Sequence, residues 1–472
     1  MRLQARRLLP RTAVLSAALA AAFPAAAQSN EELLKELRAL RERVNQLEQK
    51  LQTPPAAAPA AQPGQWGMTP EQVRELNRIA VKAEGLQDNF ADQGFKGLKI
   101  SGQMDPTYIY NKRNNNASFV FLNNGGARYT YDNSYFGMVV LDFTKETESN
   151  TIWKLTLAPE RGTGSLINGG SIVHEATVSI PLSDLQTRLW LGQLPDWTGY
   201  ELTLPAGNKL ITHNLLFDTM APTAYTGAGM DVKSGKWQVK AGLANTNTAR
   251  NKSGNNGPSV IYRVDYSKGE YDGFGFTGLH GKLPNFAADG TWVDTNNATQ
   301  TFAEAGKNTQ AHLLEFDAYF IRGDWALFGQ ASYGQQKQSA VFNSDGVLRD
   351  AKWWGLSGTM GYKFTPRFEG VLRADYVANK TNGGGLLGYS YDDGVNGIGR
   401  GVLPDGSFAK GDGVGANRYA ISLGFNYRFD ETATFKFEYR LDGANQPVFL
   451  DAKDGSYAKK NSLLGASMVV SF

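Results

Sequence analysis

Residue types that could carry catalysis or bind a metal are scarce in this chain. It has no cysteine and only four histidines, none of which lies a short metal-ligand spacing from another: His174, His213, His280 and His312. His174 precedes Glu175, but neighbouring residues on a strand point to opposite faces. No G-x-S-x-G motif occurs. We therefore expect no metal, no cofactor and no enzymatic activity, with a hydrolase as the minor alternative.

Charged residues are instead interleaved with large apolar ones. The plainest case is residues 432–443, TATFKFEYRLDG, in which Phe435 and Phe437 alternate with Lys436 and Glu438. A period of two predicts a β-strand with one apolar and one polar face. Such a polar face suits either the surface of a soluble sandwich or the aqueous lumen of a membrane barrel.

This pattern recurs from residue 97 to the end of the chain, where glycine and aromatic residues are abundant. We expect sixteen strands, near residues 98–110, 132–145, 150–159, 171–180, 186–194, 222–233, 236–246, 258–267, 270–281, 311–322, 324–335, 352–363, 367–379, 417–429, 432–442 and 459–472.

The connections between these segments alternate strictly between short and long. Seven are short, such as KSGK and FTPR, and eight are long, among them residues 195–221 and 380–416. An outer-membrane barrel with both termini in the periplasm requires this alternation, because periplasmic turns are tight and extracellular loops are long. We therefore predict an all-β fold, a 16-stranded antiparallel transmembrane β-barrel over residues 97–472. A secreted, soluble all-β protein is the alternative.

The N-terminus has the pattern of a secretory signal peptide, which we expect over residues 1–27. Four arginines precede an apolar stretch from Thr12 to Phe23, and small residues end at Ala27. An amphipathic soluble helix is the alternative. Removal of these residues takes away four arginines and no acid, so the net charge of +3 becomes −1. The chain then has no basic excess that would indicate nucleic-acid binding.

Residues 28–52 are expected to form a coiled-coil oligomerisation helix. Its heptad seam consists of Leu33, Leu37, Leu40, Val44, Leu47 and Leu51. If two such helices lie parallel, the charges that flank the seam on one helix face charges of opposite sign on the other, which favours a parallel homo-oligomer. A single amphipathic helix is the alternative. A Pro/Ala linker is expected over residues 53–68, and a short helix with a lead-in over residues 69–96.

With a signal peptide, heptads, a Pro/Ala linker and sixteen strands that end in MVVSF, the chain resembles Gram-negative outer-membrane porins. Its layout is similar to that of phosphate-selective and dicarboxylate-type porins that carry an N-terminal coiled coil. The resemblance implies a homotrimer in outer-membrane lipid, with the coil in the periplasm, that lets small polar solutes diffuse passively. It also implies that the terminal Phe472 is read by the barrel-insertion machinery. In the last strand, Leu463 and Val469 interrupt the alternation.

The resemblance further implies that the third long connection, residues 195–221, folds into the lumen and narrows it. Its apolar run LITHNLLF favours an inward course, although packing on the wall or a subunit contact is an alternative. The expected constriction residues are Asp196, Trp197, Tyr200, Glu201, Lys209, His213 and Asp218.

Ionisable residues on the polar strand faces are expected to line the pore. The cations are Lys154, Arg188, Lys240, Arg263, Arg373, Arg418, Arg428, Lys436 and Arg440, and the acids are Asp142, Glu175, Asp265, Glu315, Asp317, Glu369, Asp375 and Glu438. Five of these cations concentrate on the thirteenth to fifteenth strands, which predicts a basic stripe that attracts anionic solutes: Arg373, Arg418, Arg428, Lys436 and Arg440. Wall salt bridges are the alternative for the cations, and a structural barrel that tethers periplasmic partners is the alternative function.

Overall fold

The computed structural model describes residues 74–75, 77–82, 94–122, 136–159, 172–222, 224–246, 257–285, 291–293, 296, 298–301, 306–340, 346–379, 381, 394–410 and 413–472. The chain divides into two compact units, Met1–Leu86 and Gln87–Phe472. In the first unit, residues 74–75 and 77–82 are helical. The predictions for residues 1–27, 28–52 and 53–68 lie outside the described residues.

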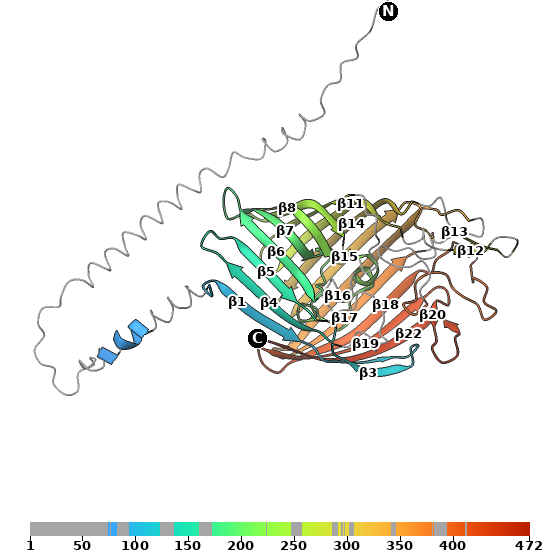
Figure 1. Ribbon diagram of the computed structural model, residues 1–472. Helices are drawn as coiled ribbons and strands as arrows, with labels where there is room; N and C mark the ends of the chain where they lie inside the picture. The colour runs from blue at the N-terminus through green and yellow to red at the C-terminus, as the bar shows by residue number, and fades with distance from the viewer. Residues whose placement is uncertain are drawn as a thin grey trace, which may run out of the picture. The chain divides into compact units, whose positions relative to one another are not determined.

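The second unit is a closed antiparallel β-barrel (Figure 1). Its hydrogen-bonded sheet has 18 strands. Counting β1 and β2 as one interrupted strand, and leaving out the short β3 (Asn116–Val120) that pairs only with β2, gives the sixteen strands that the sequence predicts. The wall strands are β1 (Leu98–Met104), β2 (Thr107–Asn111), β4 (Val139–Glu146), β5 (Ile152–Leu157), β6 (Val173–Pro181), β7 (Thr187–Pro195), β8 (Ala224–Ser234), β9 (Trp237–Thr246), β10 (Ser259–Ser267), β11 (Asp272–Pro284), β14 (Asn308–Arg322), β15 (Trp325–Gln336), β16 (Ala351–Thr365), β17 (Phe368–Ala378), β18 (Arg418–Arg428), β19 (Ala433–Ala444) and β22 (Lys460–Ser471).

Short strands in the long connections were not predicted. They are β3, β12 (Thr291–Val293), β13 (Thr299–Thr301), β20 (Phe449–Leu450) and β21 (Tyr457–Ala458). The second wall strand, β4, also begins later than predicted, at Val139 rather than residue 132. The reason is that β3 pairs with the β2 part of the first strand, whereas β4 pairs only with the β1 part. Segments of two to five residues offer too few positions for a period of two to be recognised.

The two faces of the wall differ as the alternation predicts. On β16, Trp353, Ser357 and Thr359 point inward and are buried, whereas Trp354 and Leu356 point outward and are exposed. Exposed aromatic and aliphatic residues continue around the outer surface. A continuous apolar outer face is suited to lipid and not to water.

The C-terminal strand closes the barrel. The backbone N–H of Phe472 donates to the Gly102 carbonyl at 3.0 Å, and the N–H of Gly102 donates back to Phe472 at 3.2 Å. Leu463 and Val469, which interrupt the alternation of β22, are both buried inside. Leu463 belongs to a buried apolar cluster that includes Ile211 of the connection following β7, so this inward residue is part of the barrel's interior packing.

The interruption between β1 and β2 depends on Asp105, and we expect Asp105→Ala to lower the heat stability of the barrel. The buried carboxylate accepts hydrogen bonds from the backbone N–H groups of Gly137 at 2.9 Å and Met138 at 2.7 Å. Each buried amide left without its partner costs about 1–3 kcal/mol. The measurement is the temperature at which the folded band converts to the unfolded band on a gel. The conversion temperature of Asp105→Asn, which keeps one acceptor, should lie between those of the wild type and Asp105→Ala. An unchanged temperature for Asp105→Ala would contradict this role.

Candidate functional site: the lumen and its inner connection

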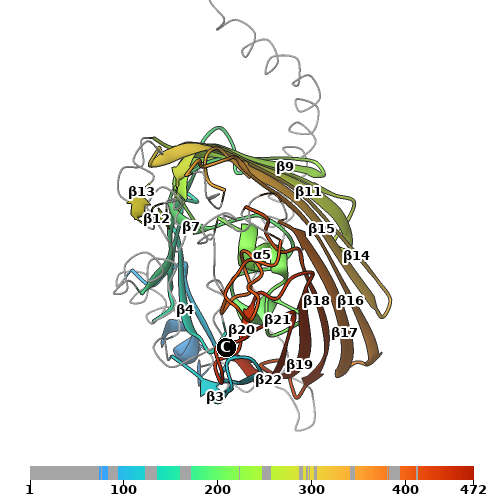
Figure 2. The ribbon, with the colours of Figure 1, turned by 90° about the vertical axis from the view of Figure 1, so that its right-hand side faces the viewer.

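The chain between β7 and β8 runs inside the barrel, and we call residues 196–222 the inner connection. It leaves and rejoins the wall at adjacent positions, since Pro195 and Ala224 are cross-strand partners. It contains the 3₁₀ helix η1 (Pro205–Gly207) and the helix α5 (Leu215–Met220). All six residues of α5 are buried. Figure 2 shows α5 within the ring of strands. The helix contacts β15, β16 and β17, so the connection covers one side of the lumen.

Two local features fix α5. The side chain of Asn214 caps the helix, because its Oδ1 accepts a hydrogen bond from the Phe217 N–H at 2.7 Å. The helix also needs space against the barrel wall, and Gly355 of β16 provides this space because it has no side chain. A Cβ at Gly355 would lie 3.0 Å from Leu216 and 2.9 Å from Met220, so a larger residue would push the helix away.

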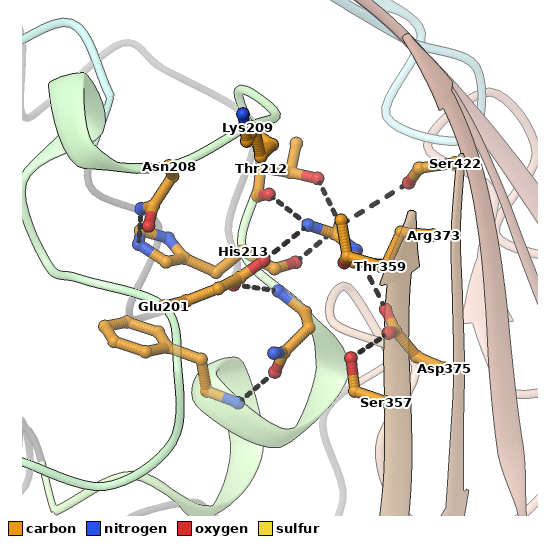
Figure 3. A network of polar contacts seen from close by, with 12 residues as sticks. Glu201, Asn208, Lys209, Thr212, His213, Ser357, Thr359, Arg373, Asp375 and Ser422 are labelled. Atoms are coloured by element: carbon orange, nitrogen blue, oxygen red, sulfur yellow. Dashed lines mark hydrogen bonds and ion pairs between the residues drawn. The ribbon is translucent and has the colours of Figure 1, made fainter. Parts of the chain in front are cut away.

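Arg373 on β17 binds the inner connection to the wall. Its side chain is fully buried, and its guanidinium donates to the backbone carbonyls of Thr212 at 2.6 Å and His213 at 2.9 Å. It also pairs with Glu201 of the connection at 3.0 Å and with Asp375 of its own strand at 3.2 Å. Figure 3 shows these groups converging on the one guanidinium. The fixed fork of an arginine allows such multiple contacts, which a lysine could not reproduce.

Two residues of β19 bind the same turn of the connection. The carboxylate of Glu438 accepts hydrogen bonds from the backbone N–H groups of Ile211 at 2.9 Å and Thr212 at 2.8 Å. Arg440 donates to the Thr212 hydroxyl at 3.0 Å and pairs with Asp442 at 3.1 Å. Each buried charge therefore has both an opposite charge and hydrogen bonds, the condition for keeping ions away from water.

The remaining expected constriction residues are also engaged. The hydroxyl of Tyr200 lies 2.7 Å from the Ser357 hydroxyl. Asp218 lies 3.6 Å from Arg440. The imidazole Nε2 of His213 lies 2.8 Å from the Leu202 carbonyl oxygen. Both His213 and Asp218 belong to the connection, outside the wall strands. Burial lowers the pKa of His213 to about 3 and raises the pKa of Asp218, against the opposing effect of Arg440.

The tip of the connection is bound near the end of the barrel that carries the short turns, which we call the short-turn end. Lys209 pairs with Glu369 at 2.7 Å, and its backbone carbonyl accepts a hydrogen bond from the Asn426 side chain at 3.0 Å. Lys436 donates to the Asn208 carbonyl at 2.5 Å. The connection is thus held along its length by β17, β18 and β19.

The start of the connection contacts a second group of charges. The Trp197 carbonyl accepts a hydrogen bond from Arg263 at 2.7 Å, and Arg263 forms a two-pronged ion pair with Asp317 at 2.8 and 2.9 Å. Asp196 turns the chain by accepting the Thr198 N–H at 2.8 Å.

Glu315, the other expected wall acid, is buried and accepts a hydrogen bond from Ser332. Asp317 is likewise buried, and neither acid lies on an open lumen surface.

The basic stripe expected on β17, β18 and β19 is not an open surface. Arg373, Lys436 and Arg440 are buried under the inner connection. Arg418 is buried beneath long-loop residues, pairing with Asp442 at 2.9 Å and donating to the Asn396 carbonyl at 2.5 Å. Among these five cations, only Arg428 is exposed. The alternation predicted which way the side chains point, but not that the connection and neighbouring acids would cover them.

The inner wall from β4 to β9 keeps water-accessible charges. The side chain of Lys154 is 40% exposed and pairs with Glu175 at 2.6 Å. Arg188, Asp231 and Lys240 also face inward and are partly exposed. Both signs are present, so this wall is polar without a strong net charge.

The described residues offer little for other chemistry. Among them, no group of three or more His, Cys, Asp or Glu side chains could hold a metal ion. Within the same ranges, no helix has the length and apolar character needed to cross a membrane.

Comparison with solved structures shows the fold. OmpT, an outer membrane protein of Vibrio cholerae folded in vitro, matches at a TM-score of 0.50 with 10% identity, covering 79% of this chain and 97% of that one. The anion-selective porin from Comamonas acidovorans has a TM-score of 0.49 and 12% identity, covering 79% and 99%. Salmonella typhi OmpF in complex with daunomycin has a TM-score of 0.46 and 11% identity, covering 79% and 97%.

No curated protein matches this chain. The family model described as "Protein of unknown function (DUF3138)" matches residues 68–472, which include the whole barrel. The chain therefore belongs to the DUF3138 family.

Proposed function

We propose that the protein forms a water-filled pore in the outer membrane of a Gram-negative cell, through which small polar or anionic solutes diffuse passively past the inner connection. The observation that carries this is the contrast between the two faces of one closed wall. The outer face exposes residues such as Trp354 and Leu356, whereas partly exposed charges such as Lys154 face the interior. An apolar exterior with a polar interior suits a membrane channel.

The inner connection would act as the constriction, because it fills the lumen along β15 to β19 and leaves the wall from β4 to β9 with its accessible charges. Its ionisable groups contact wall residues or its own backbone, as Glu201 and Lys209 illustrate. Groups held in this way favour a fixed constriction over catalysis, and we propose that the protein is not an enzyme.

The remaining parts of this proposal concern assembly. The exposed aromatic ring of Phe472 stands at the closing strand, where the insertion machinery could read it. A homotrimer in outer-membrane lipid, assisted by a periplasmic coil over residues 28–52, completes the proposal. The layout of phosphate-selective and dicarboxylate-type porins remains a prediction from the sequence.

The test is the conductance of planar lipid bilayers exposed to the purified mature protein. We expect discrete current steps, in groups of three if the pore is a trimer. Folding is checked separately by the shift in gel mobility on heating, and heat-denatured protein is the control. Folded, heat-modifiable protein that inserts into vesicles but never carries current would contradict the proposed pore.

A further inference from the structure

Two histidines face each other on adjacent strands of the barrel wall. His280 of β11 and His312 of β14 are cross-strand partners, and their Nδ1 atoms lie 2.9 Å apart. In the chain they are 32 positions apart, so their spacing along the sequence gives no sign of the pair. The antiparallel pairing of β11 with β14 alone brings them together.

Both imidazoles lie on the outer face of the wall. Leu279, next to His280, and Leu313, next to His312, are buried in the interior. Because successive residues of a strand point to opposite faces, the two histidines point away from the lumen. Phe316, four positions after His312 on the same face, is exposed.

The pair stands at the edge of the apolar band, toward the end of the barrel that carries the long loops. Outward aromatic side chains form a row across the strands just below it: Tyr262, Tyr333 and Trp354. In the next row toward the long loops, the two histidines are followed by Gln335 and Lys352. Aromatic rows mark the boundary between membrane and water in such barrels. A dissolved ion can therefore reach the two imidazoles.

The separation of the two Nδ1 atoms suits a single metal ion. Two nitrogens that lie about 2.0–2.1 Å from an ion, at about 90° to each other, are about 2.9 Å apart. In the ion-free pair, the Nδ1–H of one ring donates to the Nδ1 of the other. When an ion binds, that proton moves through water to Nε2 of the same ring, which stays neutral. A small rotation of both rings then directs the two lone pairs to the ion.

Tyr262 orients one of the two rings. Its hydroxyl oxygen lies 3.2 Å from the Nε2 of His280. The tyrosine reaches this place by lying across Gly278, where a Cβ would meet its ring. When the Nε2–H of His280 donates to this hydroxyl, Nδ1 carries no proton and its lone pair is available to a metal. A hydrogen bond from the second ring nitrogen is the usual support of a metal-binding histidine.

The ligand atoms determine which ions fit. Imidazole nitrogen suits Cu²⁺, Ni²⁺ and Zn²⁺, whereas Ca²⁺ and Mg²⁺ prefer oxygen ligands. In the described part of the chain, no acid completes a group of three with the two histidines. A right angle between the nitrogens favours the tetragonal geometry of Cu²⁺ over the tetrahedral geometry of Zn²⁺, and Cu²⁺ also binds most tightly in the divalent series.

We propose that His280 and His312 bind one divalent transition-metal ion, with Cu²⁺ held most tightly, on the outer surface of the barrel. The two Nδ1 atoms are its protein ligands, and water occupies the remaining positions. This site does not depend on the proposed pore, because it lies on the opposite face of the wall from the lumen.

The test is calorimetric titration of the purified, folded protein in detergent with copper(II) sulfate at neutral pH, with glycine present as a weak competing chelator. Electron paramagnetic resonance of the complex identifies the ligands. We expect one saturable ion per chain, with hyperfine splitting from two imidazole nitrogens. Zinc should bind more weakly than copper, and an excess of calcium should not displace the copper.

Substitutions locate the ion. Tyr262→Phe, which removes only the orienting hydroxyl, should weaken copper binding by about tenfold. His280→Gln and His312→Gln should each weaken it further and remove one nitrogen from the resonance spectrum. Tyr333→Phe is the matched control, because it belongs to the same aromatic row but its hydroxyl contacts Gln335, and it should leave the affinity unchanged.

The contrary results are equally specific. Folded wild-type protein without saturable copper binding would overturn the proposal, and so would binding that both histidine variants retain. Equal losses in Tyr262→Phe and Tyr333→Phe would contradict the orienting role of Tyr262. The heat-dependent gel shift verifies that each variant is folded. Absence of copper binding would leave the proposed pore intact, and absence of current would leave this site intact.

Discussion

Replacing Arg373 with methionine is expected to loosen the inner connection, which would raise the single-channel conductance and its noise and lower the heat stability of the barrel. The arginine is fully buried and compensates Glu201 and Asp375 while it holds the carbonyls of Thr212 and His213. Removing one partner of a buried ion pair costs about 3–5 kcal/mol, because the remaining charge is left without compensation. Conductance in bilayers and the heat-dependent gel shift measure the two effects.

Two further variants identify the cause. Arg373→Met combined with Asp375→Asn should recover part of the stability, because one of the uncompensated carboxylates is removed with its partner. Arg322→Met is the control for removing an exposed arginine, since Arg322 ends β14 at the short-turn end. Wild-type stability and current in Arg373→Met would show that the connection is held by its apolar packing alone.

Replacing residues 196–223 with Asn-Gly is expected to leave a folded barrel with a wider lumen. Pro195 and Ala224 are already cross-strand partners, so a two-residue hairpin turn can join them. The ladder between β7 and β8 does not use the connection, and its hydrogen bonds should remain. Wall charges such as Arg373 and Arg440 would become hydrated rather than stay buried without partners.

Swelling of solute-loaded liposomes measures the consequence for transport. The shortened chain should admit larger sugars than the wild type, and the same heat-dependent gel shift verifies that both are folded. The same size limit for both proteins would mean that the lumen is narrowed elsewhere, for example by the loops around Phe449 and Ile398, which are buried at the long-loop end.

The wall was predictable from sequence because each strand is long enough to show its period. In the twelve-residue β19, Phe435, Phe437 and Tyr439 alternate with polar residues, and the regular alternation of short and long connections indicated a closed barrel. β3 could not be found in this way, because its five residues lie in a polar connection and acquire their pairing from β2.

The site was predictable only in part. The run LITHNLLF indicates a buried course for the connection, and the structure places Leu215 and Leu216 among buried residues. The contacts of Arg373 could not be deduced, because its partner Thr212 lies 161 positions away in the sequence. Thr212 itself, which two arginines and Glu438 contact, has no sequence signal that distinguishes it from other threonines.

Alternation also gives no information on what covers an inward side chain. Lys154 and Arg440 both occupy inward positions, yet Lys154 is 40% exposed and Arg440 is fully buried. The difference comes from the path of the inner connection across the lumen. A count of charges along the strands therefore overestimates the basic surface that a solute would meet.

We expect this barrel to conduct and the inner connection to limit the current. The most direct measurement is the single-channel conductance of the Asn-Gly variant beside the wild type, in the same bilayer and salt. Both proteins should give discrete steps, and the steps of the variant should be several-fold larger. Steps of equal size from two folded, heat-modifiable barrels would contradict this expectation.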